Sequence, residues 1–149
     1  MAEDELARRL RAMSRRLLGV DYGRVRLGIA VSDALGITAS PLGHVPRSDD
    51  AQAATVVVAL AQRESAVGIV LGLPLHAHGA AGANVRWVRD FADQLRRRTQ
   101  LPLHEVDERY SSVEAEERLR AQGRWPAPPG QIDALSAVIL LERFLAGER

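Results

Sequence analysis

Four acidic side chains stand in or beside apolar segments of this sequence, where an ionised carboxylate is costly to bury without a cation. They are Asp21 within LLGVDYG, Asp107 and Glu108 near the end of PLHEVDER, and Asp133 at the start of IDALSAVILLERFL. Several carboxylates in one place suit Mg²⁺ or Mn²⁺, which prefer oxygen ligands. Two such ions about 4 Å apart can activate a water and stabilise the leaving oxygen of a phosphodiester. If the fold brings these acids together, the sequence predicts metal-dependent phosphodiester hydrolysis.

The strand and helix patterns predict which elements position the acids. Runs rich in β-formers predict strands at 17–23, 25–33, 37–45, 67–74 and 102–109. The first three are expected to be antiparallel, and Pro41 places the third at a sheet edge. Apolar periodicity predicts helices at 50–64 with Asp49 or Asp50 as N-cap, at 82–98, at 111–122 with a serine cap, and at 132–145. The order βββαβαβαα predicts an α/β fold in which helices flank a five-stranded mixed sheet.

In this arrangement the acids meet at one edge of the sheet. The first, fourth and fifth strands are expected to be the central neighbours of the sheet, and the carboxyl ends of such strands form the crevice where sites are built. Asp133 shares a helix face with Ala137, Leu140 and Phe144, which must be buried, so it is expected to point at the sheet.

Each acid also has a purely structural explanation. Asp133 could complement the helix dipole in a first turn. Asp21 could be a turn acid that pairs with Arg24 or Arg26. One acid of the 107–108 pair could form an ion pair with the arginine that follows it. The metal site is therefore supported by the combination of acids rather than by any one of them.

Length and composition narrow the class of protein. The 149 residues, 46% hydrophobic and 26% charged, indicate one globular domain with a full core. The absence of cysteine excludes disulfides, thiol nucleophiles and Cys-ligated metals. With no apolar run of bilayer length and no signal- or transit-peptide pattern, we expect a cytoplasmic protein without a membrane anchor. The formal net charge of +1 does not identify a nucleic-acid binder, and the phosphate-loop, GxGxxG, GxSxG and HExxH motifs are absent.

Four ordered blocks of the sequence resemble a known family. These blocks are GVDYGRVRLGIAVSD, VLGLPL, VDERYSS and IDALSAVILLERFL, and the resemblance runs from Leu17 to Leu145. They are similar to the YqgF family of RNase H-like nucleases, described as Holliday junction resolvases and as nucleases that mature the 5′ end of 16S ribosomal RNA. The resemblance implies an RNase H-like fold. It also implies a metal-dependent hydrolase that uses two Mg²⁺ or Mn²⁺ ions. In this family pattern Asp21, Glu108 and Asp133 are the catalytic residues and metal ligands, and Asp107 is a further metal ligand beside them.

The partners expected for such an enzyme are nucleic acids. We expect pre-16S ribosomal RNA, alone or in ribosomal precursor particles, with branched DNA as the alternative substrate. The alternative to an enzyme is a catalytically weak RNA-binding factor that acts in ribosome assembly or transcription. Arg24, Arg26, Arg86 and Arg109 could hold phosphates around the acidic centre, a positioning role without sequence information. The chain could be a monomer or a homodimer.

Three segments depart from the family pattern or lie outside it. His76 and His78 stand where the family has an Asn-x-Asp-Gly turn, and they could move protons near the metals or simply face solvent. The segment 123–131 contains three prolines, and Trp125 in it could stack on a base or anchor the loop. Residues 1–14 are expected to be a flexible N-terminal extension, followed by a single nuclease domain at 15–149.

Overall fold

The computed structural model describes residues 2–74 and 82–147. Its strands are β1 (Leu17–Asp21), β2 (Arg26–Ser32), β3 (Ala39–Pro46), β4 (Gly68–Leu73) and β5 (Leu103–Asp107). Its helices are α1 (Ala2–Met13), α2 (Asp50–Arg63), α3 (Gly82–Arg96), α4 (Ser111–Ala121) and α5 (Pro129–Leu145).

The strands form one mixed sheet in the order β3-β2-β1-β4-β5. β1 pairs antiparallel with β2, and β2 with β3, whereas β1, β4 and β5 run parallel. The predicted fold class is confirmed, and so is the edge position of the strand that contains Pro41. β4 is buried along its whole length because it lies between two parallel neighbours and helices cover both faces. The carboxyl ends of β1, β4 and β5 therefore lie side by side, as expected. The expected central position of the fifth strand is wrong, because β5 pairs with β4 alone and forms the second edge of the sheet.

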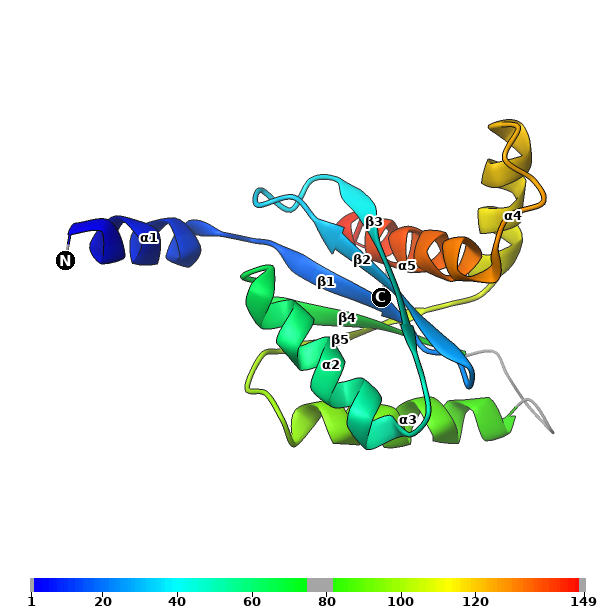
Figure 1. Ribbon diagram of the computed structural model, residues 1–149, viewed down its shortest axis with the longest axis horizontal. Helices are drawn as coiled ribbons and strands as arrows, with labels where there is room; N and C mark the ends of the chain where they lie inside the picture. The colour runs from blue at the N-terminus through cyan, green and yellow to red at the C-terminus, as the bar shows by residue number, and fades with distance from the viewer. Residues whose placement is uncertain (1, 75–81, 148–149) are drawn as a thin grey trace.

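Helices cover the sheet on both sides (Figure 1). On one face α2 and α3 pack onto a core that includes Leu18, Ile69, Leu71 and Phe91. On the other face α5 packs along the sheet through Ala137, Val138, Leu140 and Leu141, and α4 packs against α5. The helix predicted to bury the face that carries Ala137 and Leu140 thus closes the second core.

The starts of the helices differ in part from the prediction. Of the two predicted caps, Asp49 is the N-cap of α2, and its carboxylate accepts a hydrogen bond of 2.8 Å from the Gln52 amide. The serine cap predicted for α4 is wrong: Tyr110 occupies the N-cap position and its side chain makes no capping hydrogen bond.

The last helix also begins earlier than expected, at Pro129, because proline fits the first helical position where no amide hydrogen bond is needed. Asp133 consequently lies in the second turn of α5, and the first turn contains no acid. The explanation of Asp133 as a first-turn complement to the helix dipole is therefore wrong.

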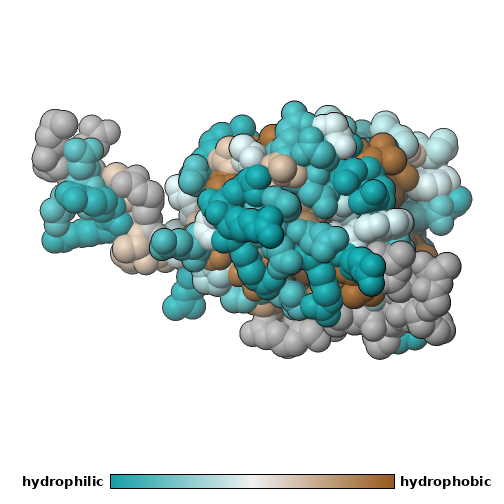
Figure 2. Space-filling view, turned by 90° about the horizontal axis from the view of Figure 1, so that it is seen from below, coloured by the Kyte–Doolittle hydropathy of each residue, from teal (hydrophilic) through white to brown (hydrophobic). Residues whose placement is uncertain are grey.

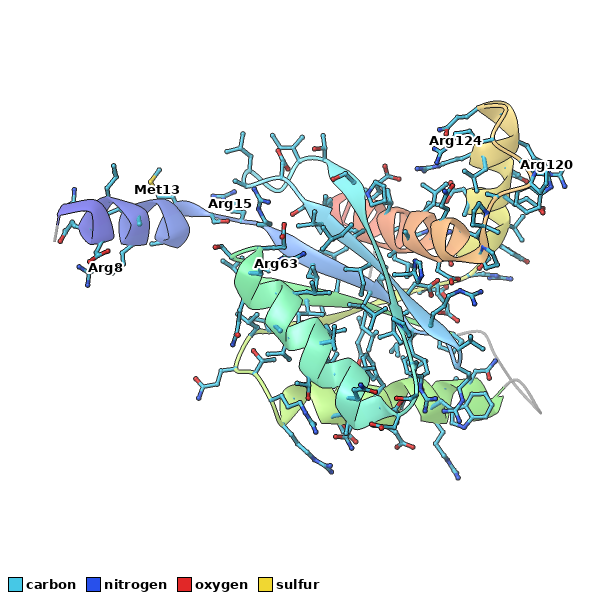
Figure 3. All side chains as sticks on the ribbon, viewed as in Figure 1. Arg8, Met13, Arg15, Arg63, Arg120 and Arg124 are labelled. Carbon is cyan, nitrogen blue, oxygen red and sulfur yellow. The ribbon has the colours of Figure 1, made fainter. Side chains whose placement is uncertain are left out.

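The N-terminal helix α1 projects away from the body of the molecule (Figures 1 and 2). Its ion pairs, between Glu5 and both Arg8 and Arg9, are internal to the helix. Arg8 and Met13 point into open space (Figure 3), and Met13 is 75% exposed. The chain joins the body at Arg15, whose amide donates a 2.8 Å hydrogen bond to the Ala34 carbonyl. The division into an N-terminal extension and a domain that begins at residue 15 stays a prediction. The projecting helix and the bond made by Arg15 are compatible with it.

None of the helices in the described ranges combines the length and apolar character that crossing a membrane requires.

Candidate active site

Three of the predicted acids line one cleft of about 430 Å³ at the carboxyl ends of the parallel strands. Its lining consists of Asp21, Tyr22, Gly23, Arg26, Glu108, Tyr110, Ser111, Ser112, Val113 and Asp133. The predicted convergence of Asp21, Glu108 and Asp133 thus has a counterpart in the geometry, although these residues are far apart in the sequence.

Asp21 and Asp133 are brought together through a glycine. Asp21 is the last residue of β1 and is paired with Gly28 in the antiparallel register with β2. The backbone of Asp133 lies against Gly28 so closely that a β-carbon there would stand 1.8 Å from the Asp133 carbonyl oxygen. The lack of a side chain at Gly28 therefore allows α5 to carry Asp133 to the sheet next to Asp21.

Glu108 is fixed at the first position beyond β5. Its amide donates a hydrogen bond of 2.9 Å to the Leu73 carbonyl at the end of β4, which extends the parallel pairing by one residue. Its own carbonyl accepts a 3.0 Å hydrogen bond from the Ser111 amide, where α4 begins. A backbone held on both sides in this way presents the Glu108 carboxylate to the cleft in a defined position.

The cleft is electrostatically unfavourable for its own carboxylates. Burial raises the pKa of Asp21 well above its ordinary value, and the negative charges of Glu108 and Asp133 raise it further. Burial and the neighbouring charge of Asp107 raise the pKa of Glu108 to about 7. Cations bound in this cleft would relieve both effects.

One cation is already present. The Arg26 guanidinium donates to the Asp133 carboxylate through Nε, and the side chains of Arg26 and Asp133 are 31% and 26% exposed. Arg24, in contrast, donates a 3.2 Å hydrogen bond to the Tyr22 hydroxyl and lies 4.4 Å from the Trp87 ring centroid. In the described ranges neither arginine pairs with Asp21, so the explanation of Asp21 as an arginine-paired turn acid is not supported.

The donor set of the cleft fits hard divalent cations. Within the described ranges no three His, Cys, Asp or Glu side chains converge closely enough to hold one ion, and Asp133 is turned to Arg26. The three acids nevertheless offer only oxygen atoms, as Mg²⁺ and Mn²⁺ prefer. The Asp21 carboxylate, moreover, has a raised pKa and forms no side-chain hydrogen bond or ion pair with a described residue.

The remaining predicted residues lie around the cleft rather than in it. Asp107 is not part of the lining, and its carboxylate accepts a 3.0 Å hydrogen bond from the Arg109 amide. Arg24, Arg86 and Arg109 are exposed and lie outside the lining, whereas Arg26 belongs to it.

Two further predictions concern the loops. His76 and His78 lie outside the described residues. Trp125 is half-buried and packs under the Arg120 guanidinium, 4.7 Å from the ring centroid, which agrees with its role as a loop anchor. Arg120 and Arg124 mark the end of α4 and the loop after it in Figure 3.

Two residues that shape the site, Gly28 beside the cleft and Tyr110 in its lining, were not predicted from the sequence. Gly28 carries a recognisable signal, because a glycine inside a β-branched strand often marks a close backbone approach. Tyr110 carries none, since nothing in VDERYSS indicates that the chain turns through a left-handed conformation at that residue.

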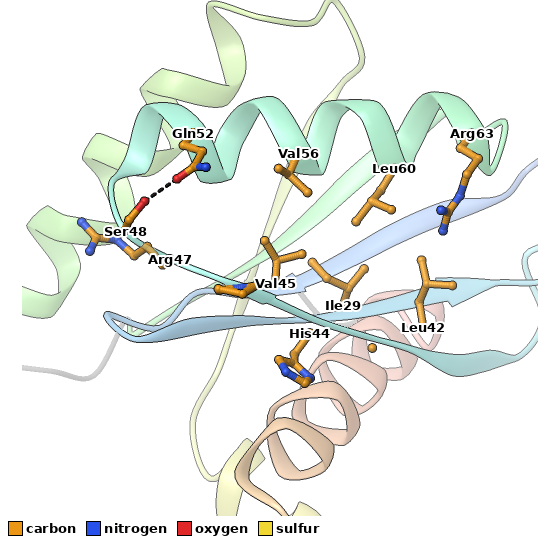
Figure 4. Close-up of a pocket in the computed structure, with 12 residues that line it drawn as sticks. Ile29, Leu42, His44, Val45, Arg47, Ser48, Gln52, Val56, Leu60 and Arg63 are labelled. Carbon is orange, nitrogen blue, oxygen red and sulfur yellow. Dashed lines mark hydrogen bonds between the residues drawn. The ribbon is translucent and has the colours of Figure 1, made fainter.

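A larger groove of about 670 Å³ lies between β3 and α2 (Figure 4). Ile29, Leu42, Val45, Val56 and Leu60 form its apolar part, and Arg47 and Arg63 lie at its two ends. No carboxylate belongs to its lining. The oxygen donors that suit a hard divalent cation therefore line the smaller, acidic cleft and not this groove.

Comparison with known proteins agrees with this geometry. The sequence profile of the RuvX family, described as Holliday junction resolvase, matches residues 15–147. A relative from Synechococcus elongatus is 38% identical over 133 residues, which cover 89% of this chain and 89% of the relative. One from an Anaeromyxobacter species is 41% identical over 134 residues, covering 89% of this chain and 97% of the relative. Both are provisionally named pre-16S rRNA nuclease.

Among solved structures, the fold is similar to that of T. thermophilus RuvC in complex with a Holliday junction substrate. The TM-score is 0.57 at 18% sequence identity, and the match covers 89% of this chain and 94% of the RuvC chain. At this identity the similarity concerns the fold, and it defines the present sheet and helices as RNase H-like. The chain belongs to the RuvX family, the same family that the four sequence blocks resemble, and it is a hydrolase of the nuclease class.

Proposed function

We propose that this protein processes the 5′ end of pre-16S ribosomal RNA by hydrolysing a phosphodiester bond in the acidic cleft. The observation that supports this most directly is that Asp21, Glu108 and Asp133 line one cleft. The relatives that are 38% and 41% identical, and whose names refer to pre-16S rRNA, favour this substrate. The reaction would take place in the cytoplasm, where the precursor RNA and its ribosomal particles occur.

Asp21, Glu108 and Asp133 would hold two Mg²⁺ or Mn²⁺ ions. Such ions, when bound, activate a water molecule and stabilise the charge on the leaving oxygen. Asp21 provides a buried carboxylate on the rigid end of β1, and Glu108 provides one from the backbone that joins β5 to α4. Asp107 acts on Glu108 through its charge, which raises the pKa of Glu108.

Arg26 is proposed to change partners during substrate binding. In this structure its guanidinium is held by Asp133. Once Asp133 is engaged as a metal ligand, the Arg26 side chain, about one-third exposed and already in the cleft lining, can bind a phosphate oxygen. Arg24 and Arg109, exposed beside the cleft, would contact flanking phosphates, with Arg86 further out on α3.

A second candidate substrate is branched DNA, because the matching family profile is described as a Holliday junction resolvase. The two substrates differ in sugar and in shape, so they can be compared directly. Nucleic-acid affinity should fall with salt for either substrate, because both are held through phosphates.

The proposal is tested by incubating the purified protein with a labelled RNA that spans the 5′ end of 16S rRNA, and separately with a four-way DNA junction. Each is incubated with Mn²⁺, with Mg²⁺ and with EDTA. We expect RNA cleavage with metal, none in EDTA, and none with Asp21→Asn. Asp93→Asn, an exposed acid on α3, is the matched control and should cleave normally. Preferential cleavage of the junction would favour the second substrate, and RNA binding without cleavage of either would favour the catalytically weak binding factor.

A further inference from the structure

Tyr110 adopts a backbone conformation that suits tyrosine poorly. Its φ and ψ are 60° and 14°, in the left-handed region, where a β-carbon approaches the following carbonyl and where glycine and asparagine are favoured. It is also the N-cap of α4, a position that favours a short side chain able to accept a hydrogen bond from the first turn. The Tyr110 side chain makes no such bond. Asparagine would suit this position better on both counts.

The tyrosine side chain does not recover this cost by packing in a core. It is 66% exposed, whereas Glu108, two residues earlier, is half-buried and the following Ser111 is buried. Tyr110 instead belongs to the lining of the acidic cleft, together with Asp21, Glu108 and Asp133. The Arg109 guanidinium lies 5.2 Å from the ring centroid. The structure therefore holds an exposed aromatic ring, accompanied by a cation, at the border of the catalytic carboxylates.

We propose that Tyr110 is a stacking platform for an unpaired base of the nucleotide next to the phosphodiester bond that is cleaved. This inference rests on the proposed nuclease function and adds a subsite to it. Aromatic rings bind single-stranded nucleic acids by stacking on the face of a base, which every base possesses, and a neighbouring arginine adds a phosphate contact. A base can stack on Tyr110 only when it is unpaired at the cleavage site. Tyr110 therefore selects single-stranded or splayed sites without selecting a sequence.

The experiment measures binding separately from cleavage. A labelled RNA hairpin with a short single-stranded 5′ extension is titrated with protein in Ca²⁺, which replaces Mg²⁺ so that cleavage is suppressed. One extension base is 2-aminopurine, whose fluorescence falls when it stacks on an aromatic ring. The protein variants are Tyr110→Asn, Tyr110→Ala and Tyr110→Phe. Leu35→Ala, which alters a residue of similar exposure far from the cleft lining, is the control.

We expect Tyr110→Asn and Tyr110→Ala to bind the hairpin roughly tenfold more weakly and to lose the 2-aminopurine quenching. Tyr110→Phe should restore both, because stacking needs the ring and not the hydroxyl. Tyr110→Asn should at the same time raise the melting temperature by about 2–4 °C, since it relieves the left-handed strain and supplies a cap. A gain in stability together with a loss in affinity distinguishes a binding role from a structural one.

A second substrate locates the base. With an abasic site at the stacking position of the RNA, wild type and Tyr110→Ala should bind equally well. If the two still differ by the same factor at every abasic position, or if Tyr110→Asn binds and quenches like wild type, Tyr110 is not a stacking platform. If Tyr110→Phe does not restore binding, and wild type and Tyr110→Ala still differ on the abasic RNA, the effect belongs to the hydroxyl and the stacking role is wrong.

Failure of the nuclease proposal has a different signature: wild type would stack the base in Ca²⁺ but leave the RNA uncut in Mn²⁺. If wild type does not bind the RNA at all, both proposals fall.

Discussion

Gly28 lies directly beneath the backbone of Asp133, so that a β-carbon on Gly28 would stand 1.8 Å from the Asp133 carbonyl oxygen and 2.3 Å from its carbonyl carbon. This contact joins the second strand of the sheet to the helix that carries one of the three cleft acids. Because the contact is with backbone rather than with a flexible side chain, the helix itself must move to accommodate any side chain at this position.

We therefore expect Gly28→Ala to lower the free energy of unfolding by about 3 kcal/mol, at the upper end for overpacked sites, and to reduce cleavage strongly. Gly19→Ala is the graded control, since its β-carbon would meet the Leu141 β-carbon at 3.1 Å and needs a smaller shift. Denaturant unfolding and RNA cleavage of both variants check this. A Gly28→Ala variant as stable and active as Gly19→Ala would show that the contact does not set the site.

Asp21→Asn should separate stability from activity. In metal-free protein the buried Asp21 carboxylate is repelled by Glu108 and Asp133, so a neutral side chain of the same shape should raise the melting temperature. Cleavage should fall by more than about a hundredfold, since even outer partners of metal ligands cost about 10–100-fold when changed. Differential scanning calorimetry in EDTA and cleavage assays in Mn²⁺ measure the two effects. A loss of stability would contradict the repulsion described for this cleft.

The metal-free protein should become less stable as the pH rises from about 4.5 to about 7. The pKa of Glu108 is raised from 4.5 to about 7 in the folded state, so in this window the folded protein holds a proton that the unfolded chain has released. The stabilisation is complete below pH 4.5 and is lost as the pH passes through 7, by up to about 3 kcal/mol. Urea unfolding at several pH values in EDTA provides the curve. Glu108→Gln should reduce the slope, with the remainder due to Asp21, whose pKa is also raised. A curve that rises through the same window in wild type would contradict the prediction.

Arg26→Gln should bind Mn²⁺ more tightly than wild type. The guanidinium that now neutralises Asp133 competes with a cation for that carboxylate, and its removal should increase Mn²⁺ affinity roughly tenfold. Cleavage should nevertheless decrease at saturating Mn²⁺, because Arg26 is proposed to bind phosphate. Isothermal titration with Mn²⁺ and single-turnover cleavage test the two parts. Arg63→Gln, an exposed arginine of the β3–α2 groove, should change neither.

Removal of residues 1–12 should leave the protein intact. Helix α1 forms its ion pairs internally and projects from the body, and the first backbone bond to the body is made by Arg15. A chain that begins at Met13 should lose less than about 1 kcal/mol of stability, as for other surface changes, and should cleave RNA at the wild-type rate. A larger loss in either assay would make α1 part of the fold or of the site.

The parallel neighbours of the sheet were predictable because they depend on patterns of many residues. The continuous apolar run at 67–74 indicated an inner strand, and Pro41 indicated an edge strand. The edge position of β5 was not predicted, because its short apolar pattern does not say how many neighbours it has. Asp133 was correctly directed to the sheet by its helical spacing from Ala137 and Leu140.

Single-residue geometry was less predictable. The sequence pattern assigned the cap of α4 to serine, because serine is a good cap, but the backbone reaches the helix through a left-handed Tyr110. Likewise, the sequence pattern left open whether Arg24 or Arg26 would pair with Asp21. The arginine at 26 pairs with Asp133, which is distant in the sequence and is brought close by the tight packing of α5 on β2. Such contacts depend on the tertiary arrangement rather than on any local pattern.

The position of α5 in the chain order has a consequence for the synthesis of the protein. This helix follows every strand in the sequence, yet it supplies Asp133 and covers one whole face of the sheet. A nascent chain that has emerged only as far as α4 therefore lacks one of the three cleft acids and exposes an apolar sheet face to the surroundings. We expect such a chain to be both inactive and prone to association, with nuclease activity gained only when α5 leaves the ribosome and docks. The proposed cleavage of ribosomal RNA would thus begin only after α5 has docked on the sheet.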